Sequence, residues 1–374
     1  MSDPRYTPLR ACHEALGASF TDFGGWQMPV RYTSDLAEHH AVRQSAGIFD
    51  ISHMAEFTVQ GSGAADFLDN ALAGRLSALA VGKAKYSLLL AESGGIIDDV
   101  IVYRLEGDDF LIISNAGNRD AVSAALRDRT DGFDVVVQDV SDDYALIAVQ
   151  GPNAEAILAE TPGITDVSIP WTEQKYYAWA SANYDGVPVL LARTGYTGED
   201  GFELLVAADR AASLWDALLA AGAPHGLVPA GLAARDTLRL EAGMPLYGHE
   251  LSLDTRPAQA GLGRVVVSAK EQFVGKAALS AAAESAEAPE APVLVGLVAE
   301  GKRAGRAGYA VVDEHGSVLG EITSGALSPT LGHPIAMAYV TPSSAEEGTA
   351  VFLDVRGTRI PATVTALPFY RRTK

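Results

Sequence analysis

Two adjacent carboxylates, Asp98 and Asp99, stand in the stretch GGIIDDVIVY at residues 94–103. The β-branched residues around them predict a strand, and Gly94-Gly95 predict the turn that precedes it. Side chains alternate between the two faces of a strand, so one carboxylate must lie on the more buried face. Because burying a carboxylate without partners is costly, that one should be paired, protonated or used in chemistry. An ordinary solvated pair at the strand entrance is the alternative that these residues leave open.

A second pair of candidates is Tyr196 and Glu203, which flank a glycine-rich hairpin in RTGYTGEDGFELLV at residues 193–206. Across such a turn the two side chains could face one another or one ligand. The alternative is a turn tyrosine and a solvated strand glutamate, because polar hairpin residues commonly lie at the surface. The segment is not a dinucleotide or phosphate loop, since the GxGxxG order is absent and no helix follows it directly.

The third candidate is the charged stripe Arg235, Asp236 and Arg239 on a predicted helix, GLAARDTLRLEAG, at residues 231–243. The rest of this helix is apolar, so most of it should be buried and the charged stripe must find partners. Two interpretations are open: an internal ion-pair network, or the lining of a cavity. A guanidinium group suits a planar, bidentate partner such as a pterin or a carboxylate.

Other common site chemistries find no support in the sequence. Cys12 is the single cysteine, so disulfides, CxxC metal pairs and iron–sulfur ligation within one chain are excluded. The eight histidines show no metal-binding spacing, and we expect no metal. Cys12 and His13 are neighbours on a predicted helix and do not face each other, so we do not expect a nucleophilic cysteine.

The chain as a whole has the composition of a soluble globular protein, with 374 residues, 48% of them hydrophobic, enough for two or three domains. Its formal net charge of −19 argues against binding to nucleic acid or to an anionic membrane surface. The N-terminus lacks an apolar signal core and no apolar run approaches 18 residues, so we expect a cytoplasmic protein.

The candidate residues are carried by segments whose patterns alternate between strand and helix. Gly24-Gly25 and Pro29 predict irregular backbone at residues 23–32, and Ser34 is the expected N-cap of a helix at 34–44. Strands at 85–90, 94–103 and 109–115 predict an antiparallel meander in a small α+β sandwich at about 55–140. Further strands and helices are predicted at 144–152, 153–160, 176–180, 187–193, 211–221 and 229–243.

Near residue 277 the composition changes to Ala, Glu, Ser and Pro without a core pattern. Residues 277–292 therefore read as a solvated helix end and a linker, and mark a domain boundary. Beyond the linker, residues 293–369 carry repeated strand signals separated by Gly, Pro and Ser. This pattern predicts a small antiparallel barrel or jelly roll.

Taken together, these segments resemble one family, the aminomethyltransferase or T-protein of the glycine cleavage system. GYTGEDGFE and ARDTLRLEAGM are the most specific of the resembling motifs, which extend from residue 23 to residue 340. The others are FGGWQMPVRY, AGIFDISHM, GGIIDDVIVY, IAVQGPNA, GMPLYGHEL and TSGALSPTLGHPIAMAYV.

The resemblance implies an α+β fold with antiparallel sheets packed by helices, arranged as a three-domain ring around a central folate cavity. By this likeness, residues 1–55 and 141–276 form a discontinuous folate-binding domain and residues 56–140 an inserted ferredoxin-like domain. Residues 290–374 form a C-terminal β-barrel or jelly-roll domain.

The resemblance also implies a reaction and a set of site residues. An aminomethyl group carried on the lipoyl arm of a partner H-protein passes to tetrahydrofolate, and 5,10-methylenetetrahydrofolate and ammonia are released. By the likeness, Asp99 is the catalytic carboxylate. Glu203 and Arg235 hold the pterin ring, and Tyr196, Tyr86 and Asn115 line the pocket. Arg371 or Arg372 supplies a basic contact. The partner complex is transient, and the chain is expected to be a monomer outside it.

This assignment agrees with the chemistry of the residues. A pterin edge alternates donors and acceptors, so an acceptor Glu and a donor Arg read it together. Asp99 accepts a hydrogen bond from a folate nitrogen, orients it for attack, and its charge favours a cationic iminium formed as the thiol leaves.

Three other functions share this fold. A tetrahydrofolate-dependent demethylase would use a different donor pocket, and the match of residues 231–251 to the T-protein form argues against it. A non-catalytic folate-binding factor of iron–sulfur assembly carries a cysteine near GYTGED, where this chain has Tyr196. The folate half of a flavin-linked sarcosine or dimethylglycine dehydrogenase would need a dinucleotide-binding unit that the sequence lacks.

Overall fold

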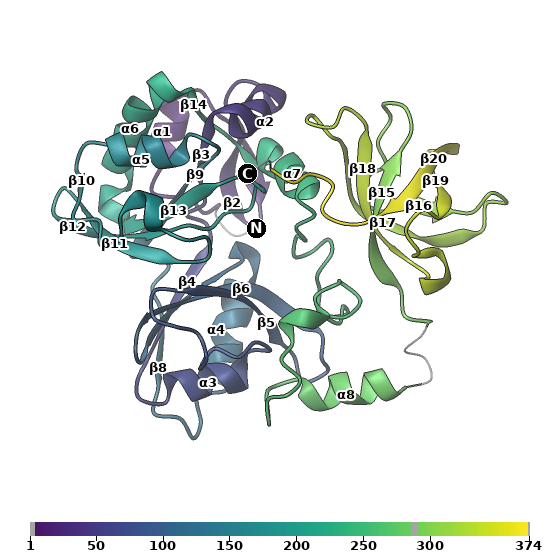
Figure 1. Cartoon of the computed structure of the whole chain (residues 1–374), viewed down its shortest axis with the longest axis horizontal. Coiled ribbons are helices and arrows are strands. Elements are labelled where there is room, and N and C mark those ends of the chain that lie inside the picture. The colour runs from purple at the N-terminus through teal and green to yellow at the C-terminus, as the bar shows by residue number, and fades with distance from the viewer. Residues whose placement is uncertain (1–3, 286–289, 373–374) are drawn as a thin grey trace. The chain divides into compact units, whose positions relative to one another are not determined.

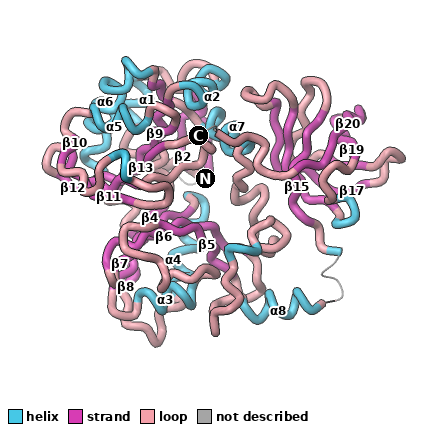
Figure 2. Tube along the Cα trace, in the orientation of Figure 1, coloured by secondary structure: helices cyan, strands magenta, loops and turns pink. Residues whose placement is uncertain are grey.

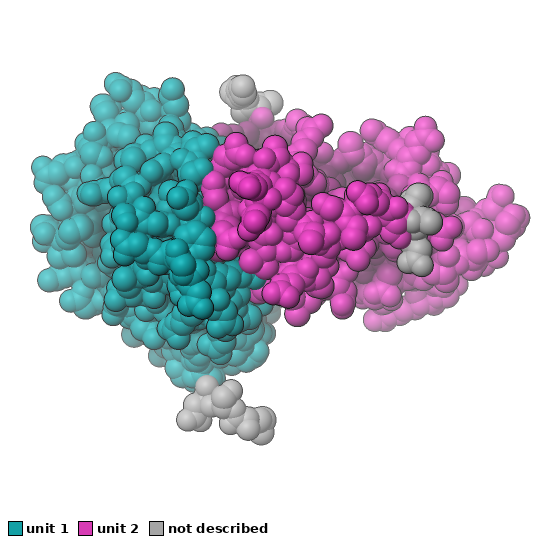
Figure 3. Space-filling model, turned by 90° about the horizontal axis from the view of Figure 1, so that it is seen from below, with its two compact units in different colours: residues 1–68, 76–86, 100–236 teal, residues 69–75, 87–99, 237–374 magenta. Residues whose placement is uncertain are grey.

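The computed structural model describes residues 4–285 and 290–372 (Figure 1). The chain divides into two compact units, coloured separately in Figure 3. Unit 1 comprises residues 1–68, 76–86 and 100–236, and unit 2 comprises residues 69–75, 87–99 and 237–374. Because the division passes through two strands of one sheet, it does not follow the three predicted domains, whose boundaries stay a prediction.

The sheet that carries the hairpin lies in unit 1 and has the strand order β10-β11-β12-β13-β9-β3-β14. Neighbouring strands are antiparallel, except that β14 runs parallel to β3. Strand β13 is flanked by β12 and β9, so Glu203 stands in the interior of the sheet. The strands are β3 (Ala46–Asp50), β9 (Tyr144–Gln150), β10 (Ile164–Thr165), β11 (Trp179–Tyr184), β12 (Val187–Ala192), β13 (Gly201–Ala207) and β14 (Leu227–Pro229).

Helices cover this sheet through a continuous apolar core. Figure 2 shows α1, α5 and α6 together beside it, and Trp215, Leu214 and Ile157 lie fully buried against strand residues such as Phe202. Ser34 accepts a hydrogen bond from the Ala37 backbone N–H, which confirms it as the predicted N-cap. The helices are α1 (Arg10–Ala15), α2 (Asp35–Gln44), α5 (Ala154–Glu160), α6 (Ala211–Gly222) and α7 (Leu232–Glu241).

The segment with Gly24-Gly25 and Pro29 is more regular than the sequence predicts. It forms a hairpin of β1 (Ser19–Phe23) and β2 (Trp26–Arg31), so the expectation of irregular backbone was wrong. Gly24 and Gly25 take φ values of +60° and +86°, the left-handed conformation of a two-residue turn. Pro29 is tolerated because β2 belongs to a two-stranded sheet, and its isolated bridge to Arg5 lies at Trp26, three residues before Pro29.

The predicted meander is confirmed. It belongs to a sheet with the order β5-β6-β7-β4-β8, in which the three strands of the meander are neighbours. The strands are β4 (Ala55–Gln60), β5 (Ala84–Leu90), β6 (Ile96–Glu106), β7 (Asp109–Ser114) and β8 (Val136–Asp139). The accompanying helices are α3 (Ala64–Ala71), the short 3₁₀ helix η1 (Ala116–Asn118) and α4 (Arg119–Arg127).

The C-terminal strands confirm the predicted barrel, which closes in the order β15-β18-β17-β16-β19-β20 around its own apolar core. Helix α8 (Lys276–Glu284) precedes it and has no buried residue, as expected for a solvated helix end; residues 286–289 of the predicted linker lie outside the described residues. The strands are β15 (Val293–Ala299), β16 (Ala310–Val312), β17 (Val318–Leu327), β18 (Pro334–Val340), β19 (Ala350–Val355) and β20 (Thr358–Thr365). None of the helices in the described part of the chain is long and apolar enough to cross a membrane.

Candidate functional site

A small pocket in unit 1 brings together three of the residues singled out in the sequence. The volume open to the centre of a water molecule is about 20 Å³, so the pocket holds about one water molecule. Strands β3, β9 and β13, the hairpin before β13 and the first turn of α7 supply its walls. The lining residues are Phe49, Ile51, Ala148, Gln150, Tyr196, Thr197, Glu203 and Arg235.

Glu203 supplies the acceptor of this pocket. On the neighbouring strands it stands opposite Ala192 and Ala148, so two small apolar residues flank the carboxylate and leave space beside it. Oε2 accepts a 2.5 Å hydrogen bond from the Thr194 hydroxyl. Burial raises the pKa of Glu203, while the Thr194 hydrogen bond and the charge of Arg235 act against that rise.

Arg235 supplies the donor, and the start of its helix is fixed by the backbone around it. The Glu38 carboxylate accepts hydrogen bonds from the backbone N–H groups of Gly231 and Tyr32, at 2.9 and 2.8 Å. A Cβ at position 231 would lie 2.4 Å from the Val30 carbonyl oxygen, so only glycine permits this approach. The first turn of α7 is therefore anchored before Arg235 reaches the pocket.

Gln150 holds the hairpin that carries Tyr196. Its Nε2 donates to the Thr194 carbonyl at 3.1 Å, and its Oε1 accepts from the Thr197 hydroxyl at 2.9 Å. A Cβ at Gly195 would lie 2.0 Å from that Oε1. Gln150 is not among the residues predicted from the sequence, although it lies in IAVQGPNA, one of the family-like motifs, and that motif is the signal that points to it.

The Asp98–Asp99 pair lies where β6 begins. Asp98 is fully buried and Asp99 is half-buried, so the predicted alternation is confirmed, and Asp98 is the carboxylate on the apolar face. Tyr247 lies in the same unit and donates from its hydroxyl to the Ile96 carbonyl at 3.1 Å. Burial raises the pKa of Tyr247, and the charges of Asp98 and Asp99 raise it further. The charges of both aspartates therefore act on the Tyr247 hydroxyl.

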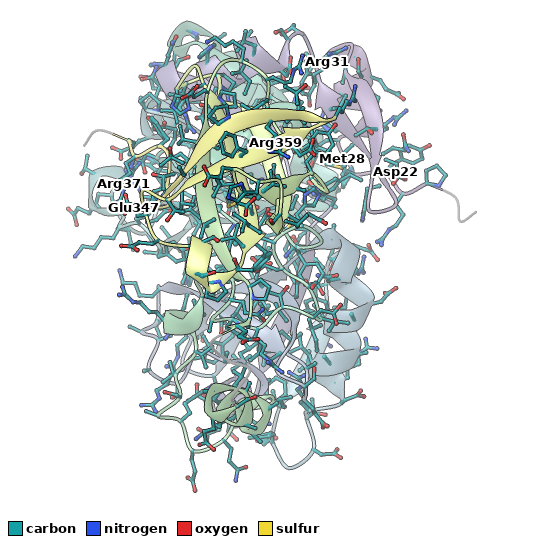
Figure 4. The ribbon with its side chains drawn as sticks, turned by 90° about the vertical axis from the view of Figure 1, so that its right-hand side faces the viewer. Asp22, Met28, Arg31, Glu347, Arg359 and Arg371 are labelled. Atoms are coloured by element: carbon teal, nitrogen blue, oxygen red, sulfur yellow. The ribbon has the colours of Figure 1, made fainter. Side chains whose placement is uncertain are left out.

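The remaining predicted residues lie on other elements. Tyr86 on β5 and Asn115 before η1 are half-buried in unit 1, and neither lines the pocket described above. Arg371 is exposed near the C-terminal end of unit 2 (Figure 4), whereas Arg372 is half-buried.

His13 belongs to a buried network rather than to a nucleophile. Its Nε2 lies 2.8 Å from Asp50 Oδ2 and its Nδ1 lies 2.9 Å from the Tyr32 hydroxyl. Both ring nitrogens are thereby engaged. Cys12 is half-buried, and burial raises the pKa of its thiol, which opposes formation of a reactive thiolate.

Comparisons with known proteins agree along the whole chain. Residues 9–270 match the family model of the GCVT N-terminal domain, and residues 293–371 match that of the glycine cleavage T-protein C-terminal barrel domain. The chain is 56% identical to an aminomethyltransferase of Cutibacterium acnes, with all of both chains covered. It is 57% identical to one of Streptomyces avermitilis, with 99% of each covered.

A solved structure is similar over nearly its full length. The crystal structure of the glycine cleavage system aminomethyltransferase T from Bartonella henselae matches with a TM-score of 0.89 and 38% identity, covering 99% of each chain.

Proposed function

This chain belongs to the aminomethyltransferase (T-protein) family of the glycine cleavage system, and from that premise we propose that the pocket of Glu203, Arg235 and Tyr196 binds the pterin ring of tetrahydrofolate. Aminomethyl transfer is the activity of the chain. The proposal concerns how its residues carry that activity out. The observation that carries it is the convergence of an acceptor, a donor and an aromatic ring in one pocket.

The chemistry of these three residues matches a flat heteroaromatic ring with donors and acceptors on its edge. Glu203 as a carboxylate accepts from ring N–H groups, and the Arg235 guanidinium donates to ring nitrogen or oxygen. Tyr196 offers an aromatic face for stacking. Because the pocket is narrow, a ring enters by its edge or after these side chains shift.

We assign the transfer step to Asp99, on β6. A carboxylate that is only half-buried can accept a hydrogen bond from a nitrogen of the substrate and stabilise positive charge that develops there. We assign a structural role in β6 to Asp98, because its side chain is fully buried. Tyr86, Asn115 and Arg371 stay predictions for the wall and rim of the site.

The second substrate arrives on a partner. We propose that the donor is the aminomethyl group on the lipoyl arm of H-protein, and that the complex is transient. The products are then 5,10-methylenetetrahydrofolate and ammonia. The monomeric state and the cytoplasmic location expected from the sequence also stay predictions.

A turnover assay tests this function. The purified chain is incubated with aminomethylated H-protein and tetrahydrofolate, and ammonia and 5,10-methylenetetrahydrofolate are measured together. We expect equimolar products that require both substrates. Products from sarcosine or dimethylglycine instead would favour the demethylase, and a chain inactive with every donor would overturn the proposal.

A further inference from the structure

A chain of two hydroxyl groups leads from the core of unit 1 to Glu203. The Tyr103 hydroxyl lies 3.1 Å from Thr194 Oγ1, and Thr194 Oγ1 lies 2.5 Å from Glu203 Oε2. Tyr103 and Thr194 are 2% and 1% exposed. Tyr103 comes from β6 and Thr194 from the loop between β12 and β13, so the contact joins the seven-stranded sheet to the part of the five-stranded sheet that lies in unit 1.

The directions of these hydrogen bonds follow from the number of protons. A carboxylate is an acceptor only, so the single hydroxyl proton of Thr194 points at Glu203. Thr194 Oγ1 then has lone pairs but no second proton to give, and Tyr103 must donate to it. A proton on Oε1 would leave Oε2 able to accept from Thr194, but a hydroxyl group binds a carboxylate more strongly than a neutral carboxyl group. The hydrogen bond from Thr194 therefore favours the ionised form of Glu203.

The hydrogen bond from Thr194 matters because the surroundings of Glu203 oppose its ionisation. Burial, the largest influence, raises the pKa of Glu203, and Arg235 on α7 and the Thr194 hydroxyl act against it. Titratable groups beside these hydroxyls and the Glu203 carboxylate include Tyr196 in the pocket wall, and Tyr176 and Tyr177 near Tyr103. Burial lowers the pKa of His53, which lies close enough to Arg235 for the charge of Arg235 to lower it further. The pKa of Tyr103 is itself raised by burial, so it remains a neutral donor at physiological pH.

We propose that Thr194 is a positioning residue for pterin recognition, and that its hydroxyl, held in turn by Tyr103, fixes the Glu203 carboxylate as the acceptor that faces the pocket. This inference rests on the proposed binding of tetrahydrofolate to that pocket. The Glu203 carboxylate is fixed at one oxygen before ligand arrives, so less freedom is lost on binding. An acceptor that took up a proton would present an O–H group to the ring N–H groups it has to read.

The test compares Thr194→Val, which removes the hydroxyl at nearly constant volume, with the wild-type chain. Tetrahydrofolate affinity is measured by calorimetry under reducing conditions from pH 5 to 9, and KM and kcat are measured in the H-protein assay. We expect Thr194→Val to weaken binding about tenfold near neutral pH. In the plot of affinity against pH, the acidic limb should move to higher pH. In the H-protein assay, KM should rise while kcat stays close to the wild-type value.

Three further variants separate positioning from structure. Thr194→Ser keeps the hydroxyl and should restore both the affinity and its pH profile, while Tyr103→Phe should move the profile in the same direction but less far. Thr161→Val is the matched control, because Thr161 is also buried, at 3% exposed, and its hydroxyl donates to the Ile157 carbonyl, 2.7 Å away. It should leave binding unchanged.

A failure of the role proposed for Thr194 can be distinguished from a failure of the proposed tetrahydrofolate binding. If the wild-type chain binds no tetrahydrofolate, the proposed function fails. If the wild type binds and Thr194→Val shows an unshifted pH profile, the positioning role is wrong. A lower melting temperature without any shift in that profile would likewise assign Thr194 to structure alone.

Discussion

The guanidinium carbon of Arg235 lies 4.5 Å from the centre of the Tyr196 ring. The two residues are 39 positions apart, on a helix and a hairpin, and both line the pocket that contains Glu203. A guanidinium group over an aromatic face is a favourable contact, and it restrains the orientation of both side chains. The pocket wall is thus preorganised for a planar partner.

This contact predicts that Arg235→Lys weakens tetrahydrofolate binding although it keeps the charge. Lysine has neither the planar stack nor the forked donors, so we expect a loss of about tenfold or more. Tyr196→Phe, which keeps the ring face, should retain more affinity than Tyr196→Leu. Calorimetric titration of the three variants checks this order. Equal losses for Phe and Leu would exclude a role for the ring face.

The hairpin predicts a strong effect of a single methyl group. Gly195→Ala places a Cβ against Gln150 Oε1 and must displace the amide that holds Thr194 and Thr197. We expect a loss of about 1–3 kcal/mol in the free energy of unfolding, together with weaker tetrahydrofolate binding. Urea unfolding and calorimetry measure the two effects. Gly107→Ala is the control, since nothing lies within 4 Å of a Cβ there. If Gly195→Ala were as stable and bound as tightly as Gly107→Ala, Gln150 would not hold the hairpin as we propose.

The two aspartates should respond differently to the same substitution. Asp99→Asn should keep tetrahydrofolate binding but lower turnover at least about tenfold, because the charge that stabilises the transition state is lost. Asp98→Asn should be mild in turnover and act on stability instead, because its side chain is in the core. Steady-state kinetics and urea unfolding of both variants distinguish these effects. Comparable turnover in the two variants would contradict the assignment of the transfer step to Asp99.

A third carboxyl group predicts a pH dependence of stability. Glu56 on β4 is 1% exposed, and neither carboxyl oxygen has a hydrogen-bond partner among the described residues. Burial raises its pKa well above the ordinary value, partly offset by Arg119, while Asp139 and Asp142 raise it further. The folded state therefore keeps the proton that the unfolded state releases near pH 4.3, approximately the usual value for Glu.

The stability contributed by protonated Glu56 is complete below the unfolded-state pKa and is lost as pH rises toward the folded-state pKa. The loss proceeds with a slope of up to about 1.4 kcal/mol per pH unit. Glu56→Gln should remove this slope, so its stability relative to wild type increases with pH. Urea unfolding between pH 4.5 and 7 measures the difference, with exposed Glu271→Gln as the control. Parallel curves for wild type and Glu56→Gln would contradict the assignment.

Much of the fold could be predicted because its signals are local. Runs of β-branched residues between glycine turns identified the meander and the barrel, and a serine before a polar helix identified its N-cap. The hairpin at residues 19–31 was missed, because glycine and proline were taken to break regular structure. The hairpin forms because the two glycines suit its turn and the proline lies in a two-stranded sheet.

From residue type and spacing, the sequence indicates candidates only where the chemistry is visible in a single residue. Tyr196, Glu203 and Arg235 were singled out in this way and line one pocket, whereas their roles come from the family resemblance and stay predictions. Thr194, Tyr103 and Gln150 were not found, because their importance depends on partners brought near by sheet pairing. Thr194 and Tyr103 are 91 residues apart in sequence. Alternation likewise placed Asp98 and Asp99 on opposite faces but did not tell which face was buried.

Calorimetric titration of tetrahydrofolate into the wild type and Glu203→Gln tests the proposed pocket most directly. We expect one binding site in the wild type and in Glu271→Gln, and binding at least about tenfold weaker in Glu203→Gln, which loses a charged acceptor. Equal affinity in all three proteins would contradict it.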